Sequence, residues 1–184
     1  MLECPAWIHA PNPMPIPSVP AAGRTGPLVS RIRALQAQAR LPAVHAFLDD
    51  IDAAGELLYP SVRRLRERGH QEDPGLEDLA LSVRQRWLEA RPDVLRLAES
   101  AAARLEEAAH SLEDRLRNEY PELWHAPPGI RLPAPLEAQF AEPEAEALAA
   151  EGELLRSTQA RAGELLALRV RLDGVEKTLD SGKG

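Results

Sequence analysis

Five histidines are the side chains of this sequence best suited to hold a metal ion or to transfer a proton, and they stand far apart. They are His9, His45, His70, His110 and His125. No second histidine follows any of them at the H-x-x-x-H spacing that returns two imidazoles to one face of a helix. The sequence therefore gives little support to a zinc hydrolase or a di-iron bundle, and we expect neither a metal nor a cofactor.

Adjacent carboxylates are the next candidates for chemistry, because two acids in one site can divide acid and base roles between them. The pairs Asp49-Asp50 and Glu106-Glu107 fall in helical patterns, where consecutive side chains point in different directions. Their simplest interpretation is solvated helix surface. The chain also has no phosphate-binding loop and no Gly-x-Ser-x-Gly turn. We therefore predict no catalytic residue and a protein that is not an enzyme.

The charge of the chain limits its partners. A net charge of −7 disfavours general binding to nucleic acid or to anionic membranes, since both would repel the protein. The best basic patch is the run Arg63, Arg64, Arg66 and Arg68. It could contact phosphates, but on an amphipathic helix such arginines cover apolar surface with their stems and pair with acids such as Glu67. We expect no nucleic-acid partner.

The single cysteine and the N-terminal sequence bear on location. Cys4 has no second cysteine to pair with, so the chain holds no internal disulfide and suits a reducing compartment. The N-terminus lacks the basic and then apolar run of a secretory signal. No stretch approaches the roughly 20 apolar residues of a membrane span. We predict a cytoplasmic protein without an integral membrane segment.

The apolar residues are mostly alanine and leucine, and aromatic residues make up only 4% of the chain. This composition disfavours a β-sandwich or barrel, whose strands draw on aromatic and β-branched residues. The predicted fold is all-α: an elongated helical bundle or antiparallel coiled coil of about five helices. It forms one domain over residues 27–184, after a disordered proline-rich tail over residues 1–26.

Apolar spacing and proline positions set the expected helix bounds. Pro60 should kink or break the helix that contains it, and Pro92 either starts a new helix or kinks a continuous one. Prolines between 121 and 142 predict a long non-helical connection. The expected helices cover residues 27–40, 43–68, 75–91, 93–119 and 143–178.

Two helix-packing seams stand out because apolar residues advance by alternating steps of three and four. The first runs through residues 93–119 and includes Ala108; the second lies near the C-terminus. Their main members are Leu105, Leu112, Leu116, Leu165, Leu168, Leu172 and Val175. Three glycines at positions 152, 163 and 174 share one face of the last helix, where they either admit a neighbouring helix or are simply tolerated.

A short motif follows the first seam, where Tyr120, Pro121 and Leu123 form Tyr-Pro-x-Leu. Pro121 acts as a helix stop signal, and Leu123 and Trp124 then fold back over the apolar seam. Alternatively, the four residues form an exposed peptide that a receptor protein binds. We favour the helix stop and keep the peptide as a candidate partner-binding site.

Two stretches carry a resemblance to a known family. Residues 78–124 contain an Arg86-Trp87 step in mid-helix, a proline-rich crossover follows, and residues 146–179 end in the helix "LRVRLDGVEKTL". In this order they resemble part of the V-shaped helical domain of ALIX-type endosomal sorting adaptors. The resemblance implies a long-armed helical fold and a place in membrane trafficking; no residue of that family's peptide pocket can be matched here.

We therefore expect a noncatalytic helical adaptor or scaffold that binds a protein partner, by resemblance in membrane trafficking. A second hypothesis is a homo-oligomeric structural coiled coil, whose 165–179 seam pairs between chains. A third is a small helical-bundle enzyme or ligand binder.

Overall fold

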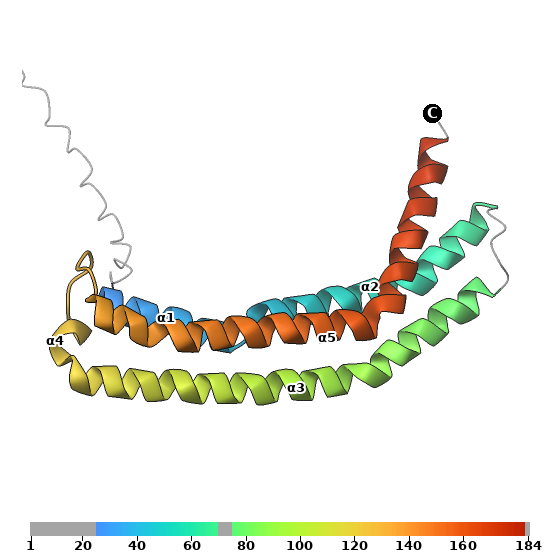
Figure 1. The fold of residues 1–184 in the computed structure, drawn as a ribbon. Coiled ribbons are helices and arrows are strands. Elements are labelled where there is room, and N and C mark those ends of the chain that lie inside the picture. The colour runs from blue at the N-terminus through green and yellow to red at the C-terminus, as the bar shows by residue number, and fades with distance from the viewer. Residues whose placement is uncertain (1–24, 70–74, 183–184) are drawn as a thin grey trace, which may run out of the picture.

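The computed structural model describes residues 25–69 and 75–182, and all regular structure in these ranges is helical. The predicted all-α fold is confirmed (Figure 1). Of the predicted N-terminal tail, only Thr25 and Gly26 belong to the described residues. The helices are α1 (Pro27–Ala39), α2 (Pro42–Glu67), α3 (Leu76–Glu119), α4 (Pro121–Trp124) and α5 (Ala134–Ser181).

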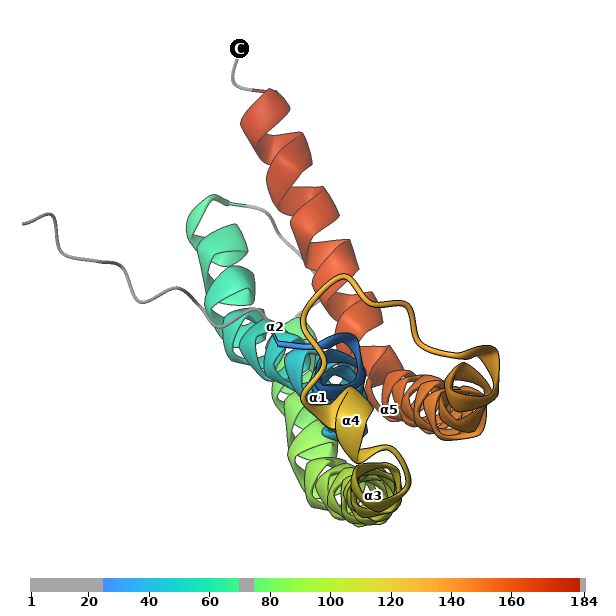
Figure 2. The same ribbon diagram turned by 90° about the vertical axis from the view of Figure 1, so that its left-hand side faces the viewer.

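The helices form an elongated bundle with three sides. α1 and α2 follow one another along one side, α3 returns antiparallel to them, and α5 runs back again (Figure 1). Seen from one end, α1, α3 and α5 surround a common axis, and α4 lies across that end (Figure 2). With 44 residues, α3 spans ~66 Å. The predicted antiparallel packing of the two longest helices is therefore present.

Two apolar clusters hold the bundle together. The larger joins α2, α3 from Leu76 to Leu105 and most of α5, and its largest buried side chain is Trp87. The smaller joins α1, the end of α3 and the start of α5, around the fully buried Phe140. The core therefore extends along the whole rod, as a bundle of amphipathic helices requires.

Of the two alternatives at Pro92, the continuous helix is present: α3 runs through Pro92, and the expected bounds that divided it between residues 91 and 93 are wrong. Pro92 is exposed, so the backbone carbonyl that loses its helical partner lies on the solvent side. The buried stripe continues across it from Trp87 to Val94, and this packing offsets the missing hydrogen bond. α2 likewise passes the exposed Pro60 without a break.

The predicted connection over residues 121–142 is also wrong in most of its length. α4 occupies Pro121–Trp124, and α5 begins at Ala134 rather than at residue 143, which leaves only residues 125–133 between the two helices. Pro135 lies in the first turn of α5, where its missing N–H has no helical partner to lose. Leu136 and Phe140 are fully buried and fix this additional segment against α1 and α3.

The break between α1 and α2 falls at Leu41, where it was expected. Leu41 adopts a left-handed backbone conformation with φ of 54°, which is unfavourable for a residue with a side chain. Its side chain is fully buried. Glu151 of α5 accepts a hydrogen bond at 3.0 Å from the N–H of Ala43 and so caps the start of α2. Tertiary contacts thus stabilise the break.

The three regularly spaced glycines of α5 do not admit a neighbouring helix. A Cβ atom added at Gly163 or Gly174 would meet no atom within 4 Å. We expect Gly163→Ala to raise the free energy of unfolding by about 1 kcal/mol through helix propensity alone. Gly55→Ala should gain less, because its Cβ would lie 3.2 Å from Cδ1 of Leu165. Urea denaturation compares the two, and equal gains would contradict this account.

Thr158 is the buried polar side chain that packing leaves unsatisfied. It is fully buried in α5, and its hydroxyl has no hydrogen-bond partner among the described residues. Thr158→Val should therefore stabilise the protein by about 1 to 2 kcal/mol in urea denaturation. Thr178→Val is the control, because the exposed hydroxyl of Thr178 already donates to the carbonyl of Gly174. A loss of stability in Thr158→Val would show that the buried hydroxyl has a partner.

Candidate functional site

The Tyr-Pro-x-Leu motif lies in the turn that joins α3 to α4. α3 ends at Glu119, and Pro121 occupies the first turn of α4. Tyr120, Leu123 and Trp124 are partly buried and pack against the smaller apolar cluster, while Pro121 is exposed. The two side chains that a peptide receptor would need, Tyr120 and Leu123, are thus engaged by the bundle itself. This geometry favours the helix stop.

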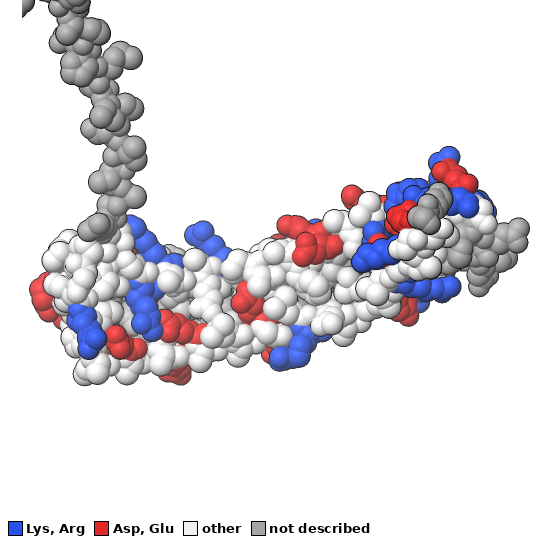
Figure 3. Space-filling model, turned by 90° about the horizontal axis from the view of Figure 1, so that it is seen from above, with Lys and Arg blue, Asp and Glu red and all other residues white. Residues whose placement is uncertain are grey.

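The arginine run of α2 is paired with carboxylates at each position. Arg63 pairs with Glu67 on the same helix, and the other three reach acids on α3 and α5. These longer pairs are Arg64 with Glu176, Arg66 with Glu77 and Arg68 with Asp180. In the view from above, acidic side chains lie among the basic ones along the rod, including the end where basic side chains gather (Figure 3). The arrangement favours the amphipathic interpretation of this run.

The described histidines, His45, His110 and His125, are all exposed, and His9 and His70 lie outside the described residues. Glu-x-x-His, a spacing found in di-iron bundles, occurs at residues 67–70, 107–110 and 122–125. In such bundles these side chains project inward, whereas Glu107 and Glu122 are exposed as well. No group of three potential metal ligands occurs among the described residues.

The two predicted seams pack inside one chain. Leu105, Leu112, Leu116, Leu165, Leu168 and Leu172 are buried, and Val175 is partly buried against the larger cluster. One member of the first seam was placed wrongly: Ala108 is exposed and Ala109 is buried instead. Alternating steps of three and four average 3.5 residues per turn, so they drift slowly around a helix of 3.6 residues per turn. Two successive steps of four, from Ala101 to Leu105 and on to Ala109, correct this drift.

Polar pairs tie the helices together at the edges of this core. Asp52 of α2 accepts hydrogen bonds from Nε1 of Trp87 and from Nε of Arg91, both at 2.7 Å. Arg31 of α1 forms a two-pronged pair with Glu144 of α5, at 2.6 and 2.9 Å, which raises the pKa of Arg31 above its ordinary value. Bidentate pairs of this kind fix both distance and orientation. They hold α1 against α5 and α2 against α3.

A largely apolar groove lies between α3 and α5, and we call it the α3/α5 groove. It has a volume of about 360 Å³, and Leu79 on its rim is 41% exposed. An ion pair of 2.9 Å between Arg86 and Glu164 crosses it. Its lining consists of Leu79, Val83, Arg86, Glu164, Ala167, Leu168 and Arg171. The apolar floor, bridged by this ion pair, can bind an apolar side chain or the apolar face of a helix.

A second groove lies between α2 and α3, but its chemistry differs. It is smaller, about 230 Å³, and its lining includes Asp52, Glu56, Arg84 and Arg91. Asp52 and Arg91 are already paired with each other. The α3/α5 groove is therefore the better candidate for an apolar ligand.

Sequence reasoning missed the α3/α5 groove. Leu79, which lies on its rim, follows the apolar spacing of the third expected helix, yet it is 41% exposed. Val170, next to the groove residue Arg171, is 71% exposed. Spacing along one helix could not show this, because exposure depends on where the neighbouring helix lies.

The chain is thus an elongated, all-helical bundle with an open apolar groove. Protein-family models, curated proteins and solved structures contain no match to it. None of the described helices is long and apolar enough to cross a membrane.

Proposed function

We propose that this protein is a noncatalytic, cytoplasmic adaptor or scaffold that binds an amphipathic helix of a partner protein in the α3/α5 groove. The observation that supports the proposal is the apolar lining of this groove on a rod of long helices. Val83 and Leu168 form its floor, and Leu79 remains exposed at its rim. A helix with apolar residues three and four apart fits such a groove between two parallel or antiparallel helices.

A photocrosslinking experiment tests the groove in cells that express the chain. A photoreactive amino acid at position 79 should give one discrete protein adduct, which Ala167→Glu should abolish by placing a charge in the groove. The same probe at Leu148, 59% exposed on a distant turn of α5, should not give this adduct. Identical adducts from both positions, or none from position 79, would refute the groove as the docking site.

The resemblance to ALIX-type adaptors supports a narrower version of the proposal, in which the protein acts in membrane trafficking. That version predicts binding of a fluorescent Tyr-Pro-x-Leu peptide, measured by anisotropy, and loss of binding in Ala167→Glu if the same groove is used. The scrambled peptide is the control. Absence of binding would remove the trafficking role and leave the general adaptor proposal to the crosslinking test.

The homo-oligomeric alternative has less support, because Leu165, Leu168 and Leu172 of the 165–179 seam are buried within one chain. We expect residues 27–184 to be monomeric across a wide range of concentrations in size-exclusion chromatography with light scattering. A stable dimer would favour the structural coiled coil over the adaptor.

A further inference from the structure

The last part of α5, Asp173–Ser181, is attached to the bundle differently from the rest of the helix, and we call it the C-terminal arm. Leu172 is the last buried residue of α5 in the described part of the chain. Within the arm, Val175 and Leu179 are only partly buried. In Figure 1 the red C-terminal part of α5, which includes the arm, turns away from the line of the rod, and α2 and α3 bend at the same end. Apolar burial therefore contributes less here than elsewhere in α5.

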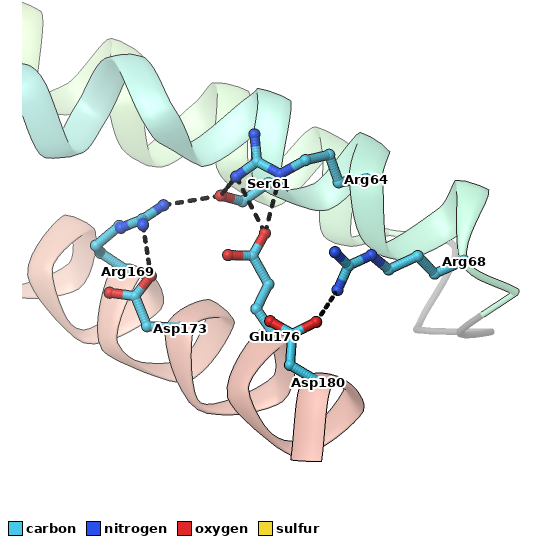
Figure 4. A network of polar contacts seen from close by, with 7 residues as sticks. All are labelled: Ser61, Arg64, Arg68, Arg169, Asp173, Glu176 and Asp180. Atoms are coloured by element: carbon cyan, nitrogen blue, oxygen red, sulfur yellow. Dashed lines mark hydrogen bonds and ion pairs between the residues drawn. The ribbon is translucent and has the colours of Figure 1, made fainter. Parts of the chain in front are cut away.

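Charged side chains provide the polar contacts between the arm and the C-terminal end of α2 (Figure 4). Arg64 donates to Oε1 of Glu176 from Nη2 and Nε, at 3.0 and 3.2 Å. Four residues further along, Arg68, which directly follows α2, donates from Nη1 to Oδ1 of Asp180 at 2.8 Å. The pair nearer the tip is the more exposed, since the side chain of Asp180 is 64% exposed and that of Glu176 is 21% exposed.

A buried polar contact marks the base of the arm. The hydroxyl oxygen of Ser61, which is fully buried in α2, accepts hydrogen bonds from Arg169 at 2.8 Å and from Arg64 at 2.9 Å. Arg169 also pairs with Asp173 at 2.5 Å. This cluster and the neighbouring Leu172 anchor α5 at the point where its buried stripe ends.

We propose that the C-terminal arm is an electrostatic clasp that separates from α2 as ionic strength rises, while the rest of the bundle stays folded. Solvent-exposed ion pairs contribute little each and are screened by salt, whereas the buried core is not. Segments held by few apolar contacts open locally at a lower free energy than the whole protein. The arm has both properties, because exposed ion pairs and few apolar contacts hold it against the bundle.

Separation would have a structural consequence at this end of the rod. Val62 and Leu65 of α2 belong to the same apolar cluster against which Val175 and Leu179 pack. Both are buried in the closed state. Opening of the clasp would therefore remove the cover that Val175 and Leu179 give to this cluster. This inference does not depend on the proposed adaptor function.

Hydrogen exchange of the full chain, read by mass spectrometry, tests the clasp. Raising sodium chloride from roughly 0.05 M to 0.5 M shortens the screening length more than twofold. Amides of residues 173–181 should then exchange about fivefold faster, the order expected when two exposed ion pairs are weakened together. Amides of residues 100–116 in α3 should not change. Equal acceleration in both segments, or none in the arm, would overturn the proposal.

Charge variants separate the clasp from ordinary fraying of a helix end. Arg68→Asp should accelerate exchange of the arm at low salt, and adding Asp180→Arg should restore protection by reversing the pair. Arg63→Asp is the matched control, because Arg63 pairs with Glu67 on its own helix. An equal effect of Arg63→Asp, or a failed rescue by Asp180→Arg, would show that the ion pair does not hold the arm.

Discussion

Leu172→Asp is expected to unfold the protein or to leave it barely folded at room temperature. Leu172 is fully buried in the larger apolar cluster, so a carboxylate there would lose its hydration without gaining a partner. The cost should exceed about 4 kcal/mol, a large fraction of the 5 to 15 kcal/mol that stabilises a typical domain. Circular dichroism during thermal and urea unfolding measures the effect.

The control for this change lies two residues away on the same helix. Val170 is 71% exposed, and Val170→Asp should change the free energy of unfolding by less than about 0.5 kcal/mol. Leu105→Asp, on α3, should behave like Leu172→Asp because Leu105 is buried in the same cluster. Similar melting of Val170→Asp and Leu172→Asp would mean that the buried face of α5 is assigned wrongly.

Trp87→Ala should have the second largest effect, a loss of about 3 to 5 kcal/mol. Trp87 is the largest fully buried side chain, and its removal leaves a cavity between α2 and α3 in the middle of the larger cluster. Its indole N–H also donates to Asp52, so the variant removes a hydrogen bond together with the packing. Urea denaturation followed by circular dichroism gives the loss without using tryptophan fluorescence.

Trp87→Phe separates packing from hydrogen bonding at this position. Phenylalanine keeps most of the apolar volume but cannot donate to Asp52, whose other oxygen still accepts from Arg91. We expect a smaller loss, about 1 to 3 kcal/mol. Adding Asp52→Asn should then cost less than it does in the wild-type background, because the indole bond is already absent. Full additivity of the two changes would contradict coupling between Trp87 and Asp52.

The two proposals concern the same end of the rod but different surfaces. The α3/α5 groove reaches Arg171 of α5, and the C-terminal arm begins at Asp173. Movement of the arm would therefore start next to the groove. Affinity of the groove for its partner, measured at low and high salt, would show whether the two surfaces are coupled. If they are, high salt should change this affinity, and Arg68→Asp should cause the same change at low salt.

The sequence alone determined the helical class and most of the buried stripes. Leu105, Leu112 and Leu116, like Leu165 and Leu172, repeat at intervals that only a helix brings to one side, and this information is local. The break before Pro42 was also predictable, because proline disfavours the helical conformation of the residue before it, and this effect depends only on neighbouring residues.

Only the tertiary structure decided which prolines end a helix and which lie within one. Pro92 and Pro60 are each able to end a helix, yet both lie on an exposed face while buried residues continue on the opposite face. The packing on both sides offsets one missing hydrogen bond in each case. At Pro135, by contrast, the fully buried Leu136 and Phe140 extend α5 into a segment that composition assigned to a connection.

Exposure and pairing were likewise settled by the neighbouring helices. Leu79 follows the same apolar spacing as Val83, but one is exposed at the α3/α5 groove and the other is buried beneath it. The arginines of α2 looked like a basic patch until α3 and α5 brought Glu77, Glu176 and Asp180 beside them. Periodicity describes the face of one helix, whereas burial and ion pairing depend on contacts between residues far apart in the chain, which no local pattern contains.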